Sequence, residues 1–328
     1  DSSLTIKPIY DAIIIAKPTK PFSEKDKFII DQYIMYGGKA LWLIDPVFAT
    51  MDSLQSQEST VGVNMNVNLD DQLFKYGVKL NNNLLLDYNC AAIALKTGQM
   101  GGQAQIEYYP WYYFPLLNPA SKNPIVSNIN PIKADFVSSL EATTSVSSVQ
   151  KTPLLKTSDY TKVSGTPVFI TLGMLKQAPD KRMFSQKSKN VAYLLTGRFE
   201  SLYANTITES DEIGFKTVSE PTSMIVVADG DVIRNQFHIP RGYPLPLGFD
   251  QYTKITYGNK DFIENAVSYL VDGEGLIGIR SRELKIRLLD KNKINNNSIG
   301  WQLVNVVVPS VVVVLLGIAL AFIREKKY

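Results

Sequence analysis

The start of the chain contains the pattern that most constrains its fold: two short apolar runs on either side of a segment with helical spacing. Residues 11–16 and 41–44 are the apolar runs, and residues 23–36 place aromatic and aliphatic side chains along one helical face. Ser23 is of a type that caps a helix, and Gly37 supplies the left-handed residue that ends one. This spacing predicts a βαβ unit, whose parallel strands lie in a sheet covered on both faces.

Strand and helix patterns continue along the rest of the chain. A second helix is predicted near 70–76, closed by Gly77, and the character becomes β-rich from about residue 103. A buried-strand pattern at 223–228 and an amphipathic helix at 261–271 return to α/β character. The predicted divisions are 1–102 (α/β domain, first part), 103–220 (β-rich portion or insertion), 221–290 (α/β return segment), 291–303 (tether), 304–323 (transmembrane helix) and 324–328 (cytoplasmic tail).

Residues 304–323 form a run without a charged side chain, and as a helix this run would match the roughly 30 Å of a bilayer core. Trp301 precedes it, and Arg324, Lys326 and Lys327 follow it, so these four residues are predicted interfacial anchors. We therefore expect one C-terminal transmembrane helix, with the C-terminus in the cytoplasm and the body on the other side. The alternative is a buried core helix or strand pair, which the many valines and a proline would suit.

The charge balance and the scarcity of cysteine and histidine exclude several classes of function. The chain has 34 basic and 31 acidic side chains, without the basic surplus typical of nucleic-acid-binding proteins. One cysteine, Cys90, and one histidine, His238, allow no intramolecular disulfide and no Cys/His metal cluster. We expect neither a nucleic-acid partner nor a bound metal.

A series of short motifs gives the chain a family resemblance. They are Asp31-Gln32-Tyr33 leading to Gly37-Gly38-Lys39 and Asp45-Pro46, Trp111 to Pro115, Asn123 to Val126, Asp229 to Asn235, and Ile279 to Arg282. In order and spacing these motifs resemble the auxiliary, substrate-binding-like proteins of bacterial ABC transporters, specifically the gliding-motility family called GldG.

The resemblance implies an α/β, parallel-sheet extracytoplasmic domain of amidotransferase or flavodoxin-like fold, with a β-rich portion. It also implies an ABC permease subunit and a cytoplasmic ATPase subunit as partners, with the body held at the bilayer of the bacterial inner membrane and facing the periplasm. Such proteins usually carry an N-terminal membrane helix as well, and we expect one to precede Asp1. The resemblance implies no cofactor and leaves the ligand unknown.

Cys90 and His238 are the residues that an amidotransferase-like reaction would need. Cys90 has strand-like neighbours and lacks the glycine-flanked elbow on which such a nucleophile sits, and no local feature sets up His238 as a base. We interpret Cys90 as a small buried residue. No catalytic residue is therefore predicted.

Three aspartates are candidate ligand contacts because they follow buried strand patterns. Asp229 and Asp231 come directly after residues 223–228, and Asp45 comes directly after residues 41–44. Ligands of open α/β sheets bind outside the carboxyl ends of the strands. A tight turn, for which Asp and Gly are preferred residues, is the favoured alternative for Asp229 and Asp231, and Asp45 can equally be a residue that ends its strand.

Trp111, Tyr112 and Tyr113 lie in the densest aromatic stretch and are candidate partner contacts, because amphipathic aromatic side chains are common in interfaces. Packing between the α/β and β-rich parts is the favoured alternative.

We conclude that the sequence predicts a non-enzymatic auxiliary component of an ABC transporter complex linked to gliding motility. The alternatives are a membrane-tethered amidotransferase-like or hydrolytic enzyme and a transporter-independent envelope scaffold.

Overall fold

The computed structural model describes residues 9–100, 103–144, 148–176, 180–207, 214–238, 241–272, 307–311 and 315–318. Contacts within the chain divide it into two units, residues 1–282 and residues 283–328. The sheets and the candidate site lie in the first unit.

The predicted βαβ unit is confirmed. It consists of β1 (Ala12–Ala16), α1 (Glu24–Met35) and β2 (Lys39–Leu43), and β1 pairs with β2 in parallel. The Ser23 hydroxyl accepts a hydrogen bond from the backbone N–H three residues on, at 3.2 Å. The chain leaves the helix through Gly37, whose φ of 90° lies in the left-handed region.

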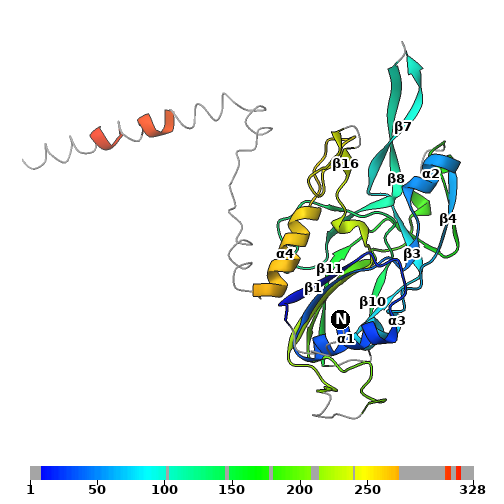
Figure 1. Ribbon diagram of the computed structural model, residues 1–328. Coiled ribbons are helices and arrows are strands. Elements are labelled where there is room, and N and C mark those ends of the chain that lie inside the picture. The colour runs from blue at the N-terminus through cyan, green and yellow to red at the C-terminus, as the bar shows by residue number, and fades with distance from the viewer. Residues whose placement is uncertain are drawn as a thin grey trace, which may run out of the picture. The chain divides into compact units, whose positions relative to one another are not determined.

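An eight-stranded mixed sheet organises the first unit. Its strands follow the order β1-β2-β15-β14-β11-β8-β7, with β9 also paired to β8 (Figure 1). The additional strands are β7 (Cys90–Met100), β8 (Gln103–Pro119), β9 (Ile132–Lys133), β11 (Val149–Lys156), β14 (Asn190–Gly197) and β15 (Thr222–Val227). Two pairings, β1 with β2 and β2 with β15, are parallel, and the other pairings of this sheet are antiparallel.

The predicted parallel, amidotransferase or flavodoxin-like α/β fold is therefore wrong. The sequence supports one helical crossover, and the prediction extended its parallel pairing to the whole sheet. Two short helices lie between β2 and β7, but they do not lead to a parallel strand, and the connections after β8 contain strands and short 3-10 turns. The strands β8, β11 and β14 therefore join the sheet in antiparallel fashion. Apolar runs alone do not distinguish the two arrangements, because a buried strand of either kind has the same composition.

The predicted transmembrane helix is also corrected. Among the described residues, every helix is too short or too polar to cross a membrane. Within 304–323, the structure describes helical residues at 307–311 and 315–318, and the remainder of that range lies outside the described residues.

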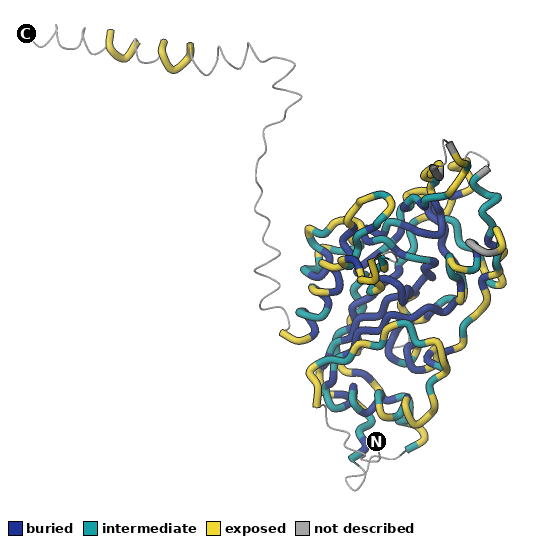
Figure 2. The backbone as a smooth tube through the Cα atoms, turned by 45° about the horizontal axis from the view of Figure 1, so that its top comes forward, coloured by how far each residue is buried: buried dark blue, intermediate teal, exposed yellow. Residues whose placement is uncertain are grey.

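Both faces of the sheet are covered, as the βαβ pattern predicts. On β2, Leu41 and Leu43 belong to the core that α4 (Asn259–Asp272) covers, whereas Ala40 and Trp42 belong to the core under α1 and α3 (Asp70–Tyr76). This alternation follows from the period of two along a strand. In Figure 2 the buried backbone runs through the centre of this unit, with exposed segments around it.

A third core lies under the long β7–β8 hairpin, which extends away from the rest of the sheet (Figure 1). Small sheets and short helices surround it and the main sheet. They are β3 (Val47–Phe48), β4 (Ser59–Asn64) and β13 (Val168–Thr171); β5 (Val78–Leu80) and β10 (Leu140–Ala142); β6 (Asn83–Asp87) and β12 (Thr161–Gly165); β16 (Phe237–His238) and β17 (Tyr243–Pro244); α2 (Met51–Gln57); and the 3-10 helices η1 (Leu172–Lys176), η2 (Lys181–Met183) and η3 (Asp231–Ile233).

Candidate functional site

Charged side chains gather where the three parallel strands end. Lys17 follows β1, Asp45 follows β2, and Asp229 and Asp231 follow β15. The Lys17 ammonium lies 3.2 Å from an Asp45 oxygen and 2.5 Å from an Asp231 oxygen. The backbone N–H of Gly230 donates to Asp45 at 2.5 Å. The structure thus brings together the three aspartates that the sequence singled out and adds a lysine that joins two of them.

Gly230 is required by the close approach of two strand ends. A Cβ atom at this position would lie 2.8 Å from Lys17 Cβ and 3.0 Å from Lys17 Cα. Real Cβ contacts are longer than this, so any larger residue would push the end of β1 away from that of β15. The Asp-Gly-Asp sequence is therefore a turn that also fixes the position of Lys17.

Burial changes the proton affinities of this cluster. Burial raises the pKa of Asp229 well above its ordinary value, and the charges of neighbouring carboxylates add to this rise. Burial also raises the pKa of Asp45, against the opposing effect of Lys17. For Lys17, burial lowers the pKa, but the two facing carboxylates outweigh it and the net shift is upward. Lys17 is accordingly a fixed cation.

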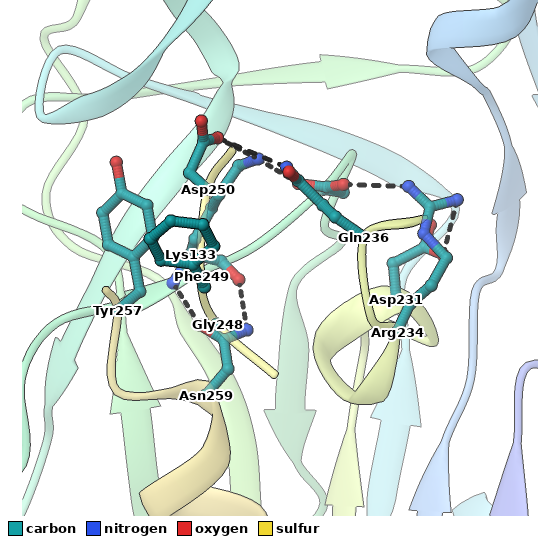
Figure 3. Close-up of a pocket in the computed structure, with 10 residues that line it drawn as sticks. Lys133, Asp231, Arg234, Gln236, Gly248, Phe249, Asp250, Tyr257 and Asn259 are labelled. Atoms are coloured by element: carbon teal, nitrogen blue, oxygen red, sulfur yellow. Dashed lines mark hydrogen bonds and ion pairs between the residues drawn. The ribbon is translucent and has the colours of Figure 1, made fainter. Parts of the chain in front are cut away.

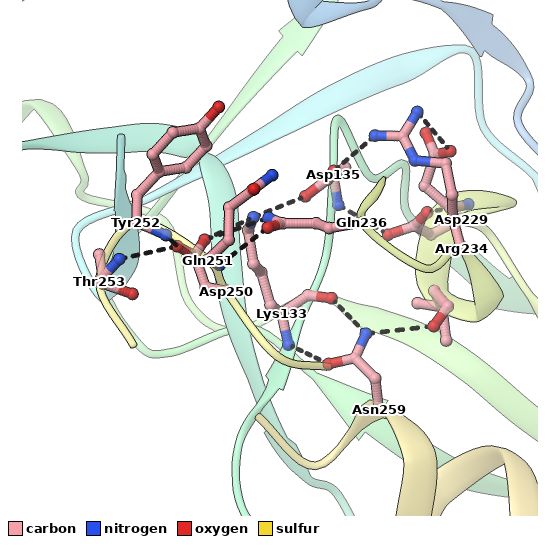
Figure 4. Close-up of polar contacts among 12 residues, drawn as sticks. Lys133, Asp135, Asp229, Arg234, Gln236, Asp250, Gln251, Tyr252, Thr253 and Asn259 are labelled. Atoms are coloured by element: carbon pink, nitrogen blue, oxygen red, sulfur yellow. Dashed lines mark hydrogen bonds and ion pairs between the residues drawn. The ribbon is translucent and has the colours of Figure 1, made fainter. Parts of the chain in front are cut away.

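The charged cluster continues away from the strand ends as an alternating series (Figure 4). The Arg234 guanidinium lies 3.2 Å from Asp231 and 3.2 Å from Asp135. The Lys133 ammonium lies 3.7 Å from Asp135 and 3.5 Å from Asp250. We call this series the charge ladder; in order, it consists of Asp45, Lys17, Asp231, Arg234, Asp135, Lys133 and Asp250.

Backbone hydrogen bonds hold the far end of the charge ladder in place. The Asn259 side chain at the start of α4 donates to the Lys133 carbonyl at 2.8 Å and accepts from the Lys133 N–H at 3.1 Å. Asp250 accepts from the N–H groups of Tyr252 and Thr253, each at 2.9 Å. Burial acts to raise the pKa of Asp250, but these N–H groups and Lys133 outweigh it, so the net shift is downward and Asp250 remains ionised.

Two adjoining cavities open beside the charge ladder. The inner cavity, of about 60 Å³, is lined by charged side chains including Lys133, Asp231 and Arg234 (Figure 3). The outer cavity, of about 310 Å³, shares Lys133 and Arg234 and extends to Phe237 and Tyr252. Both cavities therefore combine charged groups with aromatic side chains, and Phe237 and Tyr252, which line the outer cavity, are exposed.

The remaining predicted contacts lie elsewhere. Trp111, Tyr112 and Tyr113 are at most 5% exposed and belong to the third core, where Tyr112 packs 5.0 Å from Phe184 between ring centroids. The structure thus places them where packing was the favoured alternative. The predicted anchors Trp301, Arg324, Lys326 and Lys327 lie outside the described residues.

Cys90 has surroundings that disfavour catalysis, and His238 lies in a separate ribbon. Burial raises the pKa of the Cys90 thiol to about 12, and the nearby charge of Asp87 adds to this effect. A thiol with that pKa is a poor nucleophile at neutral pH. His238 belongs to the β16–β17 ribbon, where its ring stacks on Tyr243 at 5.5 Å.

The sequence did not single out five members of the charge ladder, which are Lys17, Lys133, Asp135, Arg234 and Asp250. Arg234 lies in a motif that carried the resemblance, but nothing in its spacing marks it as part of a site. Lys133, Asp135 and Asp250 come from segments that meet only in three dimensions. Within the described residues, no group of acidic, histidine or cysteine side chains has an arrangement that could hold a metal ion.

A model of the protein family described as "ABC-type uncharacterized transport system" matches residues 1–266. The chain belongs to this family. It is thereby assigned to the auxiliary components of ABC transport systems, and the resemblance to such proteins is confirmed at this level. The match does not separate the gliding-motility, GldG-type members of the ABC auxiliary family from others, so that narrower assignment stays a prediction.

Two further proteins are similar to this family member. A protein of Borreliella burgdorferi, named "Uncharacterized protein", is 23% identical over 305 residues, which are 91% of this chain and 53% of that protein. The chain thus spans about half the length of this curated relative. A solved structure titled "mmIFT52 N-terminal domain" is 12% identical, with a TM-score of 0.40 over 80% of this chain and 78% of that one. A likeness at this level says nothing about function.

Proposed function

We propose that this chain is a non-enzymatic auxiliary subunit of an ABC transport system, acting by binding, and that the permease and ATPase are separate chains. Its family membership supports the transport assignment. The observation that carries the non-enzymatic part is the pairing within the charge ladder. Each of its carboxylates, Asp45, Asp231, Asp135 and Asp250, faces a cation within 4 Å.

Paired carboxylates of this kind are poor acid–base catalysts. Asp250 stays ionised and can only accept hydrogen bonds, as described above. Asp229 has a raised pKa, as a general acid requires, but it is fully buried and its oxygens accept the backbone N–H groups of Asp135 and Asp231. A substrate therefore meets fixed charges rather than a group that is free to transfer a proton. This geometry favours binding over a hydrolytic or amidotransferase reaction.

The partner proposal is tested by purification of the chain, tagged after Tyr328, from detergent-solubilised membranes of its own cell. We expect a polytopic permease and an ATPase to be recovered in a fixed ratio to the tagged chain. Recovery of the chain with envelope proteins only would contradict the transport role and favour a scaffold. An untagged strain is the control for non-specific recovery.

We also propose that the body of the protein faces the periplasm, as the resemblance implies. A Lys260→Cys variant tests this in intact cells with a membrane-impermeant maleimide, because Lys260 is exposed on α4. The wild-type chain is the matched control, since its Cys90 thiol has a pKa of about 12. Labelling of the variant only after cell lysis would contradict a periplasmic position.

The link to gliding motility is a narrower proposal, supported by the motifs that resemble GldG proteins. It is tested by expressing this chain in a gliding strain that lacks its own auxiliary subunit. Restored spreading would support the link. A complex that assembles with the permease and ATPase but leaves the cells immobile would contradict it and leave the transport role standing.

A further inference from the structure

We propose that the two cavities beside the charge ladder bind a neutral, polyhydroxylated ligand, a sugar or the end of a glycan. This inference deepens the proposed function, because it names the ligand class of a subunit that acts by binding. It rests on three independent observations. The charges alternate along the charge ladder, the Lys133 ammonium makes only long contacts with its protein partners, and exposed aromatic rings line the outer cavity.

The alternation of charge selects against ions. An anionic ligand group at Arg234 and Lys133 would also meet Asp135, Asp231 and Asp250, and a cationic group at those carboxylates would meet Lys133 and Arg234. A hydroxyl group both donates and accepts hydrogen bonds, so it can bridge a cation and a carboxylate without repulsion from either. Neighbouring hydroxyls on a sugar ring match neighbouring cation–carboxylate pairs.

Lys133 has hydrogen-bonding capacity that its protein partners do not use. Its side chain is 14% exposed, and its closest carboxylate oxygens lie at 3.5 and 3.7 Å. Charge-assisted N–H···O bonds are normally about 2.7–2.9 Å long. The ammonium also lies 4.6 Å from the centre of the Phe114 ring. A largely buried ammonium with three donors and such long contacts can donate to an oxygen of a ligand, and both cavities reach it.

The outer cavity adds exposed aromatic surface beside the charged groups. Phe237 and Tyr252 line it and are 50% and 54% exposed. The backbone of Tyr252 is held in place because its carbonyl accepts a hydrogen bond from the hydroxyl of Tyr108 on β8, at 3.0 Å. An exposed aromatic ring with a fixed backbone can cover the C–H face of a sugar while polar groups hold its hydroxyls.

The volumes of the two cavities agree with hydroxyl groups binding in the inner cavity and a sugar ring binding in the outer cavity. A water molecule needs roughly 10–15 Å³ of such volume, so the inner cavity of about 60 Å³ has room for a few oxygen atoms but not for a ring. The outer cavity of about 310 Å³ has room for a ring and is open to a longer chain. The hydroxyls of a terminal sugar would enter the inner cavity, with the ring against Phe237 or Tyr252.

The test is ligand-observed saturation-transfer NMR with the purified chain and three matched probes: methyl glucoside, glucuronic acid and glucosamine. Methyl mannoside, methyl galactoside and methyl xyloside extend the neutral set, and trialanine represents a peptide. We expect transfer to at least one neutral glycoside and several-fold weaker transfer to both charged sugars. Equal or stronger transfer to a charged sugar or to trialanine overturns the proposal, and so does transfer to none of the neutral glycosides at millimolar concentration.

Two variants locate the binding. Lys133→Met removes the ammonium while keeping a side chain of similar length, and we expect at least a tenfold loss of affinity for the neutral glycoside. Tyr252→Ala is expected to weaken the same ligand several-fold. Lys260→Met and Tyr160→Ala are the matched controls, because both residues are exposed and line neither cavity. Undiminished binding in Lys133→Met and Tyr252→Ala, or equal loss in the controls, overturns the assignment.

These outcomes are separate from those of the proposed function. A chain that binds no sugar but purifies with a permease and an ATPase keeps its transport role and loses only this inference. A chain that binds a sugar but purifies alone keeps the site and loses the transport partners. Release of a hydrolysis product from a disaccharide would contradict the non-enzymatic role while leaving the sugar site intact.

Discussion

Asp31 on α1 and Lys133 on β9 are both charged side chains removed from water, but their surroundings differ. The Asp31 carboxylate accepts four hydrogen bonds of 2.6, 2.8, 2.9 and 3.0 Å. The donors are the Ser201 hydroxyl, the Tyr76 hydroxyl, the Leu202 backbone N–H and the Gln32 side-chain amide. Lys133 has carboxylate oxygens at 3.5 and 3.7 Å and two cavities beside it.

The comparison separates a polar group that builds the fold from one that is available to a ligand. A buried polar group with all its partners at normal distances rigidifies its surroundings and has no capacity left for binding. A buried charge with long contacts and a cavity retains that capacity. Asp31 therefore fixes α1 to α3 and to the segment at Ser201, and Lys133 marks the candidate site.

The largest expected effect is on the Asp31 side of the comparison. Asp31→Ala removes the acceptor of four buried hydrogen bonds, of whose donors the Gln32 amide keeps the Lys216 carbonyl, and we expect a loss of about 3–5 kcal/mol in the free energy of unfolding. Urea denaturation measures it. Glu264→Ala, which removes one partner of an exposed ion pair on α4, is the control and should change stability by no more than about 0.5 kcal/mol. If Asp31→Ala lost as little unfolding free energy as the control, the structural role assigned to Asp31 would be contradicted.

The strand ends that carry the charge ladder provide the second prediction. Gly230→Ala should cost about 1–3 kcal/mol, because its Cβ would overlap with Lys17. Gly165→Ala on β12 is the matched control, since nothing lies within 4 Å of the added atom there. Equal unfolding midpoints for the two variants would show that β1 and β15 do not approach as closely as described.

A third prediction uses pH to compare two carboxyl groups of the candidate site. The folded pKa of Asp229 is raised, so its contribution to stability is present below the unfolded pKa and is lost as pH rises through the folded value. The folded pKa of Asp250 is lowered, so its contribution is present above the unfolded pKa and is lost as pH falls through the folded value.

Unfolding free energies measured across a pH series should therefore separate Asp229→Asn from Asp250→Asn. The difference between wild type and Asp229→Asn should narrow as pH rises, and the difference between wild type and Asp250→Asn should narrow as pH falls. Parallel curves for wild type and both variants would show that neither carboxyl group has a different proton affinity in the folded state.

The smallest expected change in stability is that of Lys133→Met. We expect about 1 kcal/mol or less, because the large loss on removing one partner of a buried ion pair arises from the charge left unpaired, and both carboxylates that face Lys133 keep other partners. Asp250 keeps its two backbone donors and Asp135 keeps Arg234 in this variant. A loss comparable to that of Asp31→Ala would place Lys133 among the groups that build the fold.

Local structure was largely readable from the sequence, and the way the elements assemble was not. The cap at Ser23, the stop at Gly77 and the buried runs of β2 and β15 depend on neighbouring residues, and the structure has them where the pattern placed them. The antiparallel insertion of β8, β11 and β14 beside β15 depends on contacts between distant segments. A single chain gives no local signal for such contacts.

The sequence predicted only the part of the candidate site that depends on neighbouring residues. Asp45, Asp229 and Asp231 end buried strands, so a general rule about strand ends located them. Lys133 and Asp250 are more than a hundred residues apart and become neighbours only because Asn259 ties the start of α4 to β9. Periodicity and residue type carry no information about that contact.

The most direct test of the account measures stability and binding together. Urea denaturation of wild type and Lys133→Met is carried out with and without a saturating concentration of the best neutral glycoside. We predict that the ligand raises the unfolding midpoint of wild type, since it binds the folded state, and raises that of Lys133→Met much less, with similar midpoints for both proteins without ligand. A ligand-free Lys133→Met protein that is strongly destabilised, or one that the glycoside stabilises as much as wild type, would contradict the distinction between Asp31 and Lys133.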